Sequence, residues 1–411
     1  MTEPIGTFCL VLHTHLPWLA HHGSWPVGEE WLHQAWAQSY QRVLGVVDRL
    51  ADEGRTELLT LGVTPVVAAQ LDDPYCLGLQ RTWLADWHWR AMGMTAETDR
   101  TTRTLGRWEA EQARAAALGF DRWSSGGSPV LRTVADAGAV ELLGGPLAHP
   151  FSPLLDPDVL DFELAAGLHD ARLRTGRRPG GIWAPECGYR PGLADHYARA
   201  GISHFMVDGP TLRHIGASTA EAHPVGDTGV LAFGRDLDVT YRVWSPRRGY
   251  PGGKWYRDFH SYDHRWGFRH NRVTSTQTPT HEKAPYDPEA AQAAALRDAQ
   301  DFVATVRARL ADIRRERDGR PGMTVAAYDT ELFGHWWYEG PQWLEHVLRL
   351  LPQAGVRVTT LAGAIAAGLV GEPIEPTSGS WGSGKDWHVW DGENVHDIVA
   401  EVDAESDRKP P

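Results

Sequence analysis

The sequence predicts an α/β fold in which parallel strands alternate with helices, with a barrel as the expected arrangement. Three observations support this prediction. The chain has 411 residues, which is enough for one large domain with insertions. Short apolar segments alternate along it with longer segments of helical periodicity, as in βαβ units. Several apolar segments end in polar or aromatic clusters, and active sites of parallel α/β proteins form at such strand ends.

The predicted elements follow one another in this alternating order. The first strand covers residues 5–12 and ends at the cluster His13-Thr14-His15. Residues 30–52 carry apolar side chains at three- and four-residue spacing, which predicts a helix that ends before Gly54. Further strands are predicted at residues 57–63, 139–143, 181–184, 204–207, 239–243, 324–328 and 356–360. Further helices are predicted at residues 158–174, 192–200, 288–317 and 341–351.

Two insertions and a terminal segment complete the expected organisation. Residues 1–370 are expected to form the catalytic barrel. Within it, residues 72–128 predict a helical insertion, and residues 245–288 predict a long loop over the active site, because they are rich in Gly, Pro, Tyr, His and Arg and have little periodicity. Residues 371–411 are expected to form a Trp-rich C-terminal segment and a polar tail.

Composition narrows the classes of function. The formal net charge of -13 argues against a nucleic-acid or membrane partner, because binding to phosphates requires a concentrated basic surface. The three cysteines are widely spaced and form no CxxC pair, so neither disulfides nor a thiolate zinc site is expected. No basic segment precedes the short apolar N-terminal run, and no stretch is long enough to span a bilayer. A cytoplasmic protein is therefore expected, with its oligomeric state left open.

The chain is unusually rich in two side chains that bind sugars. It contains 19 tryptophans and 20 histidines, and many lie beside Gly, Pro, Asp and Glu rather than inside apolar runs. An indole ring packs against the apolar C–H face of a sugar, while histidines and carboxylates hydrogen-bond its hydroxyl groups. As a set, these residues indicate a carbohydrate site, although any single tryptophan is as readily explained by the core.

Two acidic residues directly follow predicted strands. Glu186 lies in the segment WAPECGY, where Pro185 restricts the backbone and Gly188 permits close approach. Asp329 follows the apolar segment VAAY, which favours a carboxyl group removed from water and hence a raised pKa, as a general acid requires. Glu331 competes for this role, since it would share a face of the strand with Asp329. Two carboxylates that flank a glycosidic bond are the usual means of cleaving it.

His13 and His15 are two residues apart at a strand end and so point to the same face. The pair is compatible with a metal site, with His149 and Asp329 as further ligands, or with hydrogen bonds to sugar hydroxyl groups. The neighbouring tryptophans favour the sugar, and no HExxH pair is present, so no metal or other cofactor is expected. Cys187 lacks an evident partner histidine and is not expected to be a nucleophile.

Taken in order, these segments resemble glycoside hydrolase family 57, whose members act on α-glucans. The resemblance is carried by HTHLPW, ELLGGPLAHPFSPLL, GIWAPECGYRP, AAYDTELFGHWW and SWGSGKDWHVW, which extend from residue 13 to residue 390. It implies a (β/α)7 barrel, with Glu186 as the nucleophile and Asp329 as the general acid/base of a retaining reaction. The segments WPVGEEWLHQA and VWSPRRGYPGGKWYRDF are similar to those of the 1,4-α-glucan branching enzymes within the family.

The expected function is therefore double displacement on 1,4-α-glucosidic bonds of amylose or a glycogen-like glucan, with transfer to a 6-hydroxyl. The candidate substrate-binding residues are His13, His15, Trp25, Trp31, His149, Trp183, Trp244, His335, Trp336, Trp381, Trp387 and Trp390. Branching members carry a tyrosine-tipped loop and a C-terminal helical domain, whereas here no tyrosine lies between Asp208 and Tyr241 and the sequence ends at Pro411. α-Glucan hydrolysis and 4-α-glucanotransfer thus stay open, as do a metal-dependent barrel hydrolase and a non-catalytic glucan-binding protein.

Overall fold

Parallel strands form the centre of the protein. The computed structural model describes residues 3–23, 28–245, 249–275, 277–395, 397–398 and 401. Its strands are β1 (Gly6–Thr14), β2 (Leu59–Val63), β3 (Val140–Leu143), β4 (Gly181–Ile182), β5 (His204–Val207), β6 (His223–Pro224), β7 (Leu231–Gly234), β8 (Met323–Asp329) and β9 (Val356–Thr359). One sheet has the order β3-β2-β1-β8, with β9 also paired to β1, and the other has the order β4-β5-β7-β6. Among these described strands, β6 is antiparallel to β7 and the other pairs are parallel.

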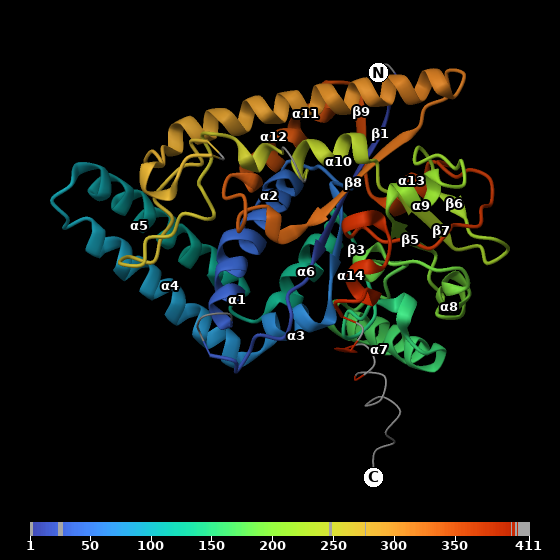
Figure 1. Ribbon diagram of the computed structural model, residues 1–411, viewed down its shortest axis with the longest axis horizontal. Coiled ribbons are helices and arrows are strands. Elements are labelled where there is room, and N and C mark those ends of the chain that lie inside the picture. Colours follow the sequence, from blue (N-terminus) through green and yellow to red (C-terminus); the bar gives the residue numbers. More distant parts are fainter. Residues whose placement is uncertain are drawn as a thin grey trace, which may run out of the picture.

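Helices surround these sheets (Figure 1). They are α1 (Glu29–Ala35), α2 (Gln41–Asp52), α3 (Pro65–Asp72), α4 (Pro74–Met94), α5 (Arg100–Phe120), α6 (Gly127–Asp136), α7 (Pro157–Thr175), α8 (Leu193–Arg199), α9 (Gly209–Arg213), α10 (Leu237–Val243), α11 (Pro288–Glu316), α12 (Gly340–Gln353), α13 (Leu361–Ala366) and α14 (His388–Asp391). A π-helical turn, Trp36–Tyr40, joins α1 to α2. In the described part of the chain, none of the helices has both the length and the apolar character that crossing a membrane requires.

Strand β1 is the central element because all nine of its residues are buried. Burial on both faces explains why its sequence, GTFCLVLHT, is apolar almost throughout instead of alternating. The parallel register places His13 of β1 beside Asp329 of β8 on one side and Gly62 of β2 on the other. The carboxyl ends of these three strands therefore lie at the same level, and the loops that follow them meet at one edge.

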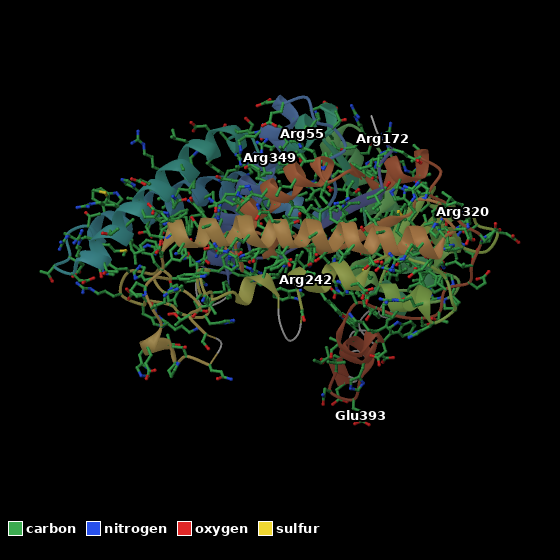
Figure 2. The ribbon with its side chains drawn as sticks, turned by 90° about the horizontal axis from the view of Figure 1, so that it is seen from above. Arg55, Arg172, Arg242, Arg320, Arg349 and Glu393 are labelled. Carbon is green, nitrogen blue, oxygen red and sulfur yellow. The ribbon has the colours of Figure 1, made fainter. Side chains whose placement is uncertain are left out.

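The longest helix, α11, supports this central strand along one side of the molecule (Figure 1). It begins where the side chain of Asp287 accepts a hydrogen bond from the backbone of Ala290, with Pro288 in its first turn. Phe302 of α11 packs edge-on against Phe8 of β1, with ring centroids 5.8 Å apart. In Figure 2, Arg242 of α10 lies next to α11, where it forms an ion pair with Asp301.

Helices α4 and α5 form an antiparallel pair that extends away from the sheets (Figure 1). Each begins with an aspartate whose side chain accepts a backbone hydrogen bond, Asp73 for α4 and Asp99 for α5. The segment between α10 and α11 lies against this pair and is built of turns and isolated bridges, including Arg257 with Arg272.

The structure corrects one predicted strand and adds two short ones, β6 and β7. Residues 239–243 form part of helix α10 rather than a strand, although they are rich in β-branched side chains. The side chain of Asp236 accepts hydrogen bonds from the backbone of Asp238 and Val239, and this N-cap outweighs the strand propensity. The strand in this region is β7, four residues long, which the sequence did not predict.

Candidate active site

Glu186 lies in a strained turn directly after β4. It belongs to the 3-10 turn Pro185–Cys187, and both Glu186 (φ 60°) and Cys187 (φ 49°) have left-handed backbone conformations. Such conformations are costly for residues with a side chain and are found mainly where the surrounding structure enforces them. The turn is closely packed at its end, since a Cβ atom added at Gly188 would lie 2.6 Å from the ring of Phe151.

Trp381 holds the carboxylate of Glu186 in place. Its indole Nε1 donates a 2.9 Å hydrogen bond to Oε2 of Glu186, and its backbone N–H donates a second one, also 2.9 Å, to the carbonyl oxygen of Glu186. Burial raises the pKa of the half-buried Glu186 carboxyl, and the hydrogen bond from Trp381 partly offsets this rise. The C-terminal segment therefore contributes directly to the setting of Glu186.

Asp329 is the last residue of β8 and is half-buried. Burial, followed by the negative charge of Glu186, raises the pKa of Asp329 to about 7, while the positive charge of Arg235 acts in the opposite direction. A carboxyl group with a pKa near neutrality can hold a proton and release it at physiological pH. The hydrogen bond from Trp381 favours the ionised form of Glu186, whereas the charge of Glu186 favours the protonated form of Asp329.

The two carboxylates line one cavity of about 530 Å³. Its aromatic walls come from Trp381 of the C-terminal segment, from Trp244 and Tyr241, and from Trp336. The rings of Trp244 and Trp336 are stacked with their centroids 6.1 Å apart, and Trp244 remains half exposed at 51%. Flat aromatic surfaces around two carboxyl groups suit a chain of neutral sugar rings.

Glu331, the competing acid, does not line this cavity. It lies in the 3-10 turn after Asp329, is buried, and accepts a 2.5 Å hydrogen bond from the hydroxyl group of Tyr40 in the π-helical turn. Burial and the charge of Asp329 raise the pKa of Glu331 to about 8, so its carboxyl group is protonated at neutral pH. Strand β8 ends at Asp329 and the 3-10 turn Thr330–Leu332 follows it, so Glu331 does not share a strand face with Asp329.

The three candidate histidines form a stacked cluster behind the cavity wall. His13 and His149 are joined by a 2.9 Å Nε2–Nε2 hydrogen bond, and the rings of His15 and His149 stack at 3.8 Å. Burial lowers the pKa of His15 to about 4 and that of His149 to about 3, so both are neutral at pH 7. His13 stacks on the buried Trp183 at 4.6 Å, and Trp183 contacts Trp381 edge-on at 4.9 Å. The histidine cluster is therefore connected to Glu186 by ring contacts, from His13 to Trp183 and from Trp183 to Trp381, whose indole donates to Glu186.

A buried ionic network fixes the Trp381 segment. Arg235, at the end of β7, donates from Nε to the buried Asp208 at 2.8 Å, and its guanidinium lies 5.2 Å from the ring centre of Trp381. Nζ of Lys385 lies 3.0 Å from the other carboxylate oxygen of Asp208 and donates a 2.9 Å hydrogen bond to the carbonyl oxygen of Trp381. Since Asp208 follows β5, the network ties three separate loops together.

The remaining predicted site residues lie in three places. Trp31, His335 and Trp336 line a second cavity, of about 730 Å³, which shares Trp336 with the first. Trp387 and Trp390 pack around Phe151, Trp390 in a stacked geometry at 4.5 Å. Trp25 lies outside the described residues.

Sequence reasoning missed Arg235, Tyr241 and Lys385, all of which line the cavity that contains Glu186 and Asp329. Arg235 directly follows β7, a strand that the sequence analysis did not predict. Had β7 been predicted, Arg235 would have been a candidate site residue for the same reason as Glu186 and Asp329, which lie at strand ends. Lys385 lies in the segment GSGK, and its ammonium group pairs with the buried Asp208, a contact that no local pattern in the sequence indicates.

The described residues give no support to the metal and thiol alternatives. They contain no group of three or more His, Cys, Asp or Glu residues placed to hold a metal ion. Cys187 is fully buried, and burial raises the pKa of its thiol well above the usual value, so it is protonated at neutral pH.

Comparison with known proteins decides the family. Residues 9–367 match the model of glycosyl hydrolase family 57. The chain belongs to this family. A probable 1,4-alpha-glucan branching enzyme of Mycobacterium tuberculosis is 58% identical over 409 residues, covering 96% of this chain and 77% of that protein.

Two solved structures are similar to this one. The crystal structure of a branching enzyme of family 57 from Thermococcus kodakaraensis, in complex with glucose and additives, has a TM-score of 0.93 at 30% identity. That match covers 98% of this chain and 79% of the other. The alpha-amylase AmyC from Thermotoga maritima has a TM-score of 0.84 at 23% identity and covers 98% and 82% of the two chains, which shows a shared fold.

In this member of family 57, replacing Trp381 by Phe should move the acid limb of the pH–rate profile to higher pH. Phenylalanine keeps an aromatic ring but lacks the Nε1–H donor, so the ionised form of Glu186 loses a stabilising hydrogen bond and its pKa rises. We expect a shift of about one pH unit in kcat/KM. Trp387→Phe is the matched control, because the indole of Trp387 donates to the carbonyl oxygen of Gly379 instead. If the acid limb of kcat/KM had the same apparent pKa in Trp381→Phe and Trp387→Phe, the result would contradict the role of the Trp381–Glu186 hydrogen bond.

Proposed function

We propose that this chain is a 1,4-α-glucan branching enzyme, which cleaves a 1,4-α-glucosidic bond and transfers the released chain to a 6-hydroxyl group. The observation that carries the proposal is the pair of half-buried carboxyl groups, Glu186 and Asp329, on the wall of one tryptophan-lined cavity. Its substrate would be amylose or a glycogen-like glucan. The 58% identity to a probable branching enzyme over nearly the whole chain supports the same conclusion.

In this proposal Glu186 is the nucleophile. Its carboxylate attacks the anomeric carbon of the donor and forms a glycosyl-enzyme intermediate. Two features support the role: the strained turn holds the carboxylate rigidly, and the hydrogen bond from Trp381 stabilises its ionised form. A fixed nucleophile requires less reorganisation on the way to the transition state.

Asp329 is the general acid/base. Its pKa of about 7 allows it to protonate the departing glycosidic oxygen in the first step and to accept a proton from the incoming hydroxyl group in the second. When Glu186 becomes part of the neutral glycosyl ester, its negative charge disappears. Asp329 then loses one of the causes that raise its pKa, which favours the ionised form needed for the second step.

We also propose that the two sheets are parts of one (β/α)7 barrel. A parallel bridge between Gly144 and Ile182 connects the end of β3 to β4. At the other end, the backbone N–H of Asp236, after β7, donates a 2.8 Å hydrogen bond to the carbonyl oxygen of Val325 in β8. These contacts support a ring of parallel strands in the order β1-β2-β3-β4-β5-β7-β8, with the two carboxyl groups at its carboxyl end.

Incubation with amylose tests the proposed function. We expect the purified protein to form new α-1,6 linkages, detected by the anomeric proton signals and by the short chains that a debranching enzyme then releases. Reducing ends should rise far more slowly than α-1,6 linkages, because a glucan acceptor outcompetes water in an aromatic site. Reducing ends that rise without α-1,6 linkages would indicate an α-glucan hydrolase and would contradict the proposal.

A further inference from the structure

The second cavity lies beside the catalytic one and has no role in the steps described above. It encloses about 730 Å³, compared with about 530 Å³ for the catalytic cavity, and Trp336 belongs to the walls of both. Its walls come from α1, from α4 and from residues 259–269 of the segment between α10 and α11. In Figure 1 this segment lies against the α4–α5 pair.

Aromatic side chains dominate the walls of the second cavity. Trp31, Phe259, Tyr262, Trp266 and Trp336 line it, and all five are half-buried. Trp31, Trp266 and Trp336 pack against the hydrophobic core with part of the side chain and leave the rest accessible. Rings held in this way offer flat apolar surfaces without the cost of ordering them when a ligand binds.

The cavity is preformed because its outer wall is fastened to α4. Arg90 of α4 donates hydrogen bonds to the carbonyl oxygens of Trp266 (3.1 Å) and Gly267 (3.0 Å), and Asp86 accepts a 2.7 Å hydrogen bond from the same arginine. The Trp266 ring packs on α4 at Gly93, where an added Cβ atom would lie 2.4 Å from it. A glycine at this position therefore leaves the space that the indole occupies.

The polar groups of the cavity suit a neutral ligand with hydroxyl groups. Both carboxylate oxygens of Glu30 are occupied, one by Trp83 and the other by Gln34, each at 2.7 Å. Arg265 is paired with Glu97. Glu30 and Arg269, whose charges have no ion pair within the described ranges, are of opposite sign and act on each other, so the cavity carries little net charge for an ionic ligand.

Arg269 offers charged donors to a ligand in the cavity. Its Nε donates a 2.7 Å hydrogen bond to the carbonyl oxygen of Phe259, and its terminal nitrogens have neither a hydrogen bond nor an ion pair within the described ranges. Burial and the nearby Arg257 lower the pKa of Arg269 to about 10, so it remains charged at neutral pH. A partly desolvated guanidinium without a carboxylate partner is a strong donor to sugar hydroxyl oxygens.

We propose that the second cavity binds the acceptor glucan chain, with its sugar rings against Trp266 and Trp31 and its hydroxyl groups on Arg269. The inference rests on the proposed function, since transfer requires a second glucan next to the glycosyl-enzyme. Trp336 lines both cavities. A glucan chain bound in the second cavity would therefore have one end next to the first cavity, whose wall includes Asp329. Neutral α-glucan is the ligand class that the aromatic walls and the balanced charges favour.

The transfer step balances with the groups already assigned. The acceptor O6 forms a bond to the anomeric carbon, and the bond from that carbon to the Glu186 oxygen breaks with its electron pair returning to the carboxylate. The O6 proton passes to Asp329. Water entering in place of the acceptor would give hydrolysis, so the occupancy of the second cavity sets the ratio of transfer to hydrolysis.

Trp266→Ala tests this inference with amylose as the donor and a fluorescently labelled malto-oligosaccharide as the acceptor. We expect the ratio of labelled transfer product to new reducing ends to fall about tenfold, and the apparent KM for the acceptor to rise by a similar factor, because a stacking surface is lost. The matched control is Trp89→Ala, since Trp89 also lies on this side, on α4, but is 75% exposed and lines neither cavity. The control should retain the wild-type ratio.

An unchanged ratio and acceptor KM in a folded Trp266→Ala variant would overturn the inference. If that variant does not fold, Arg269→Gln replaces it, with the same expected fall and the same contradictory result. Failure of the proposed function has a different signature: the wild-type protein itself would release reducing ends and label no acceptor. A wild-type protein that branches, together with a variant that branches equally well, contradicts the acceptor site alone.

Discussion

Replacing Glu186 by Gln should lower the turnover of amylose by about four to six orders of magnitude, the size of effect seen when a nucleophile is removed from an enzyme that works through a covalent intermediate. The amide is nearly isosteric, and its oxygen can still accept the hydrogen bond from Trp381. It cannot form the ester to the anomeric carbon. Turnover is best measured as new α-1,6 linkages and reducing ends over a long incubation.

Two controls separate this chemical effect from a folding defect. Glu331→Gln replaces a buried acid that is protonated at neutral pH, so we expect turnover within about tenfold of the wild-type value. The thermal unfolding midpoint of Glu186→Gln should equal or exceed that of the wild type, because burial raises the pKa of Glu186 and its charged form therefore costs stability in the folded state. Near-normal turnover in Glu186→Gln would contradict the assignment.

Replacing Asp329 by Ala should lower amylose turnover by about two to four orders of magnitude, which is the usual contribution of a general acid/base. The effect should depend on the leaving group, because Asp329 protonates the departing oxygen. With α-glucosyl fluoride, whose leaving group needs no proton, the first step should be nearly normal. Added azide should then raise turnover and give the α-glucosyl azide, since azide attacks the glycosyl-enzyme without a base.

The pH dependence of the wild-type enzyme should also reveal the proton transfer by Asp329. Asp329 must be protonated in the first step, so kcat/KM for amylose should fall as the pH rises through the Asp329 pKa of about 7. Asp329→Ala should abolish this alkaline limb. Two results would assign the proton transfer to another group. One is an alkaline limb that persists in Asp329→Ala, and the other is a turnover of Asp329→Ala that azide does not raise.

The sequence predicted most of the strands and the location of Glu186 and Asp329 at strand ends, for a physical reason. Strand β1 is buried on both faces and therefore apolar throughout, Asp329 is the last residue of β8, and Glu186 lies in the turn after β4. Local patterns of this kind are visible without coordinates. The misassigned residues 239–243 show the limit, because the capping side chain of Asp236 there decides between helix and strand.

Features that depend on contacts between distant segments could not be predicted. The choice between Asp329 and Glu331 depends on Tyr40, which is 291 residues away from Glu331 in sequence and reaches it from a π-helical turn. The network of Asp208, Arg235 and Lys385 likewise joins loops that only the folded chain brings together. Ion pairing across long sequence separations leaves no periodic signal in the chain.

Covalent labelling of Glu186 tests the central claim most directly. In a fluorinated α-glucosyl fluoride the ring fluorine slows both steps, and the reactive fluoride leaving group restores the rate of the first step only. The glycosyl-enzyme should therefore accumulate. Proteolysis and mass spectrometry should then find one glucosyl adduct on the peptide that spans residues 179–190, at Glu186. An adduct on Asp329 or Glu331 instead, or turnover of the reagent without any adduct on Glu186, would contradict the mechanism.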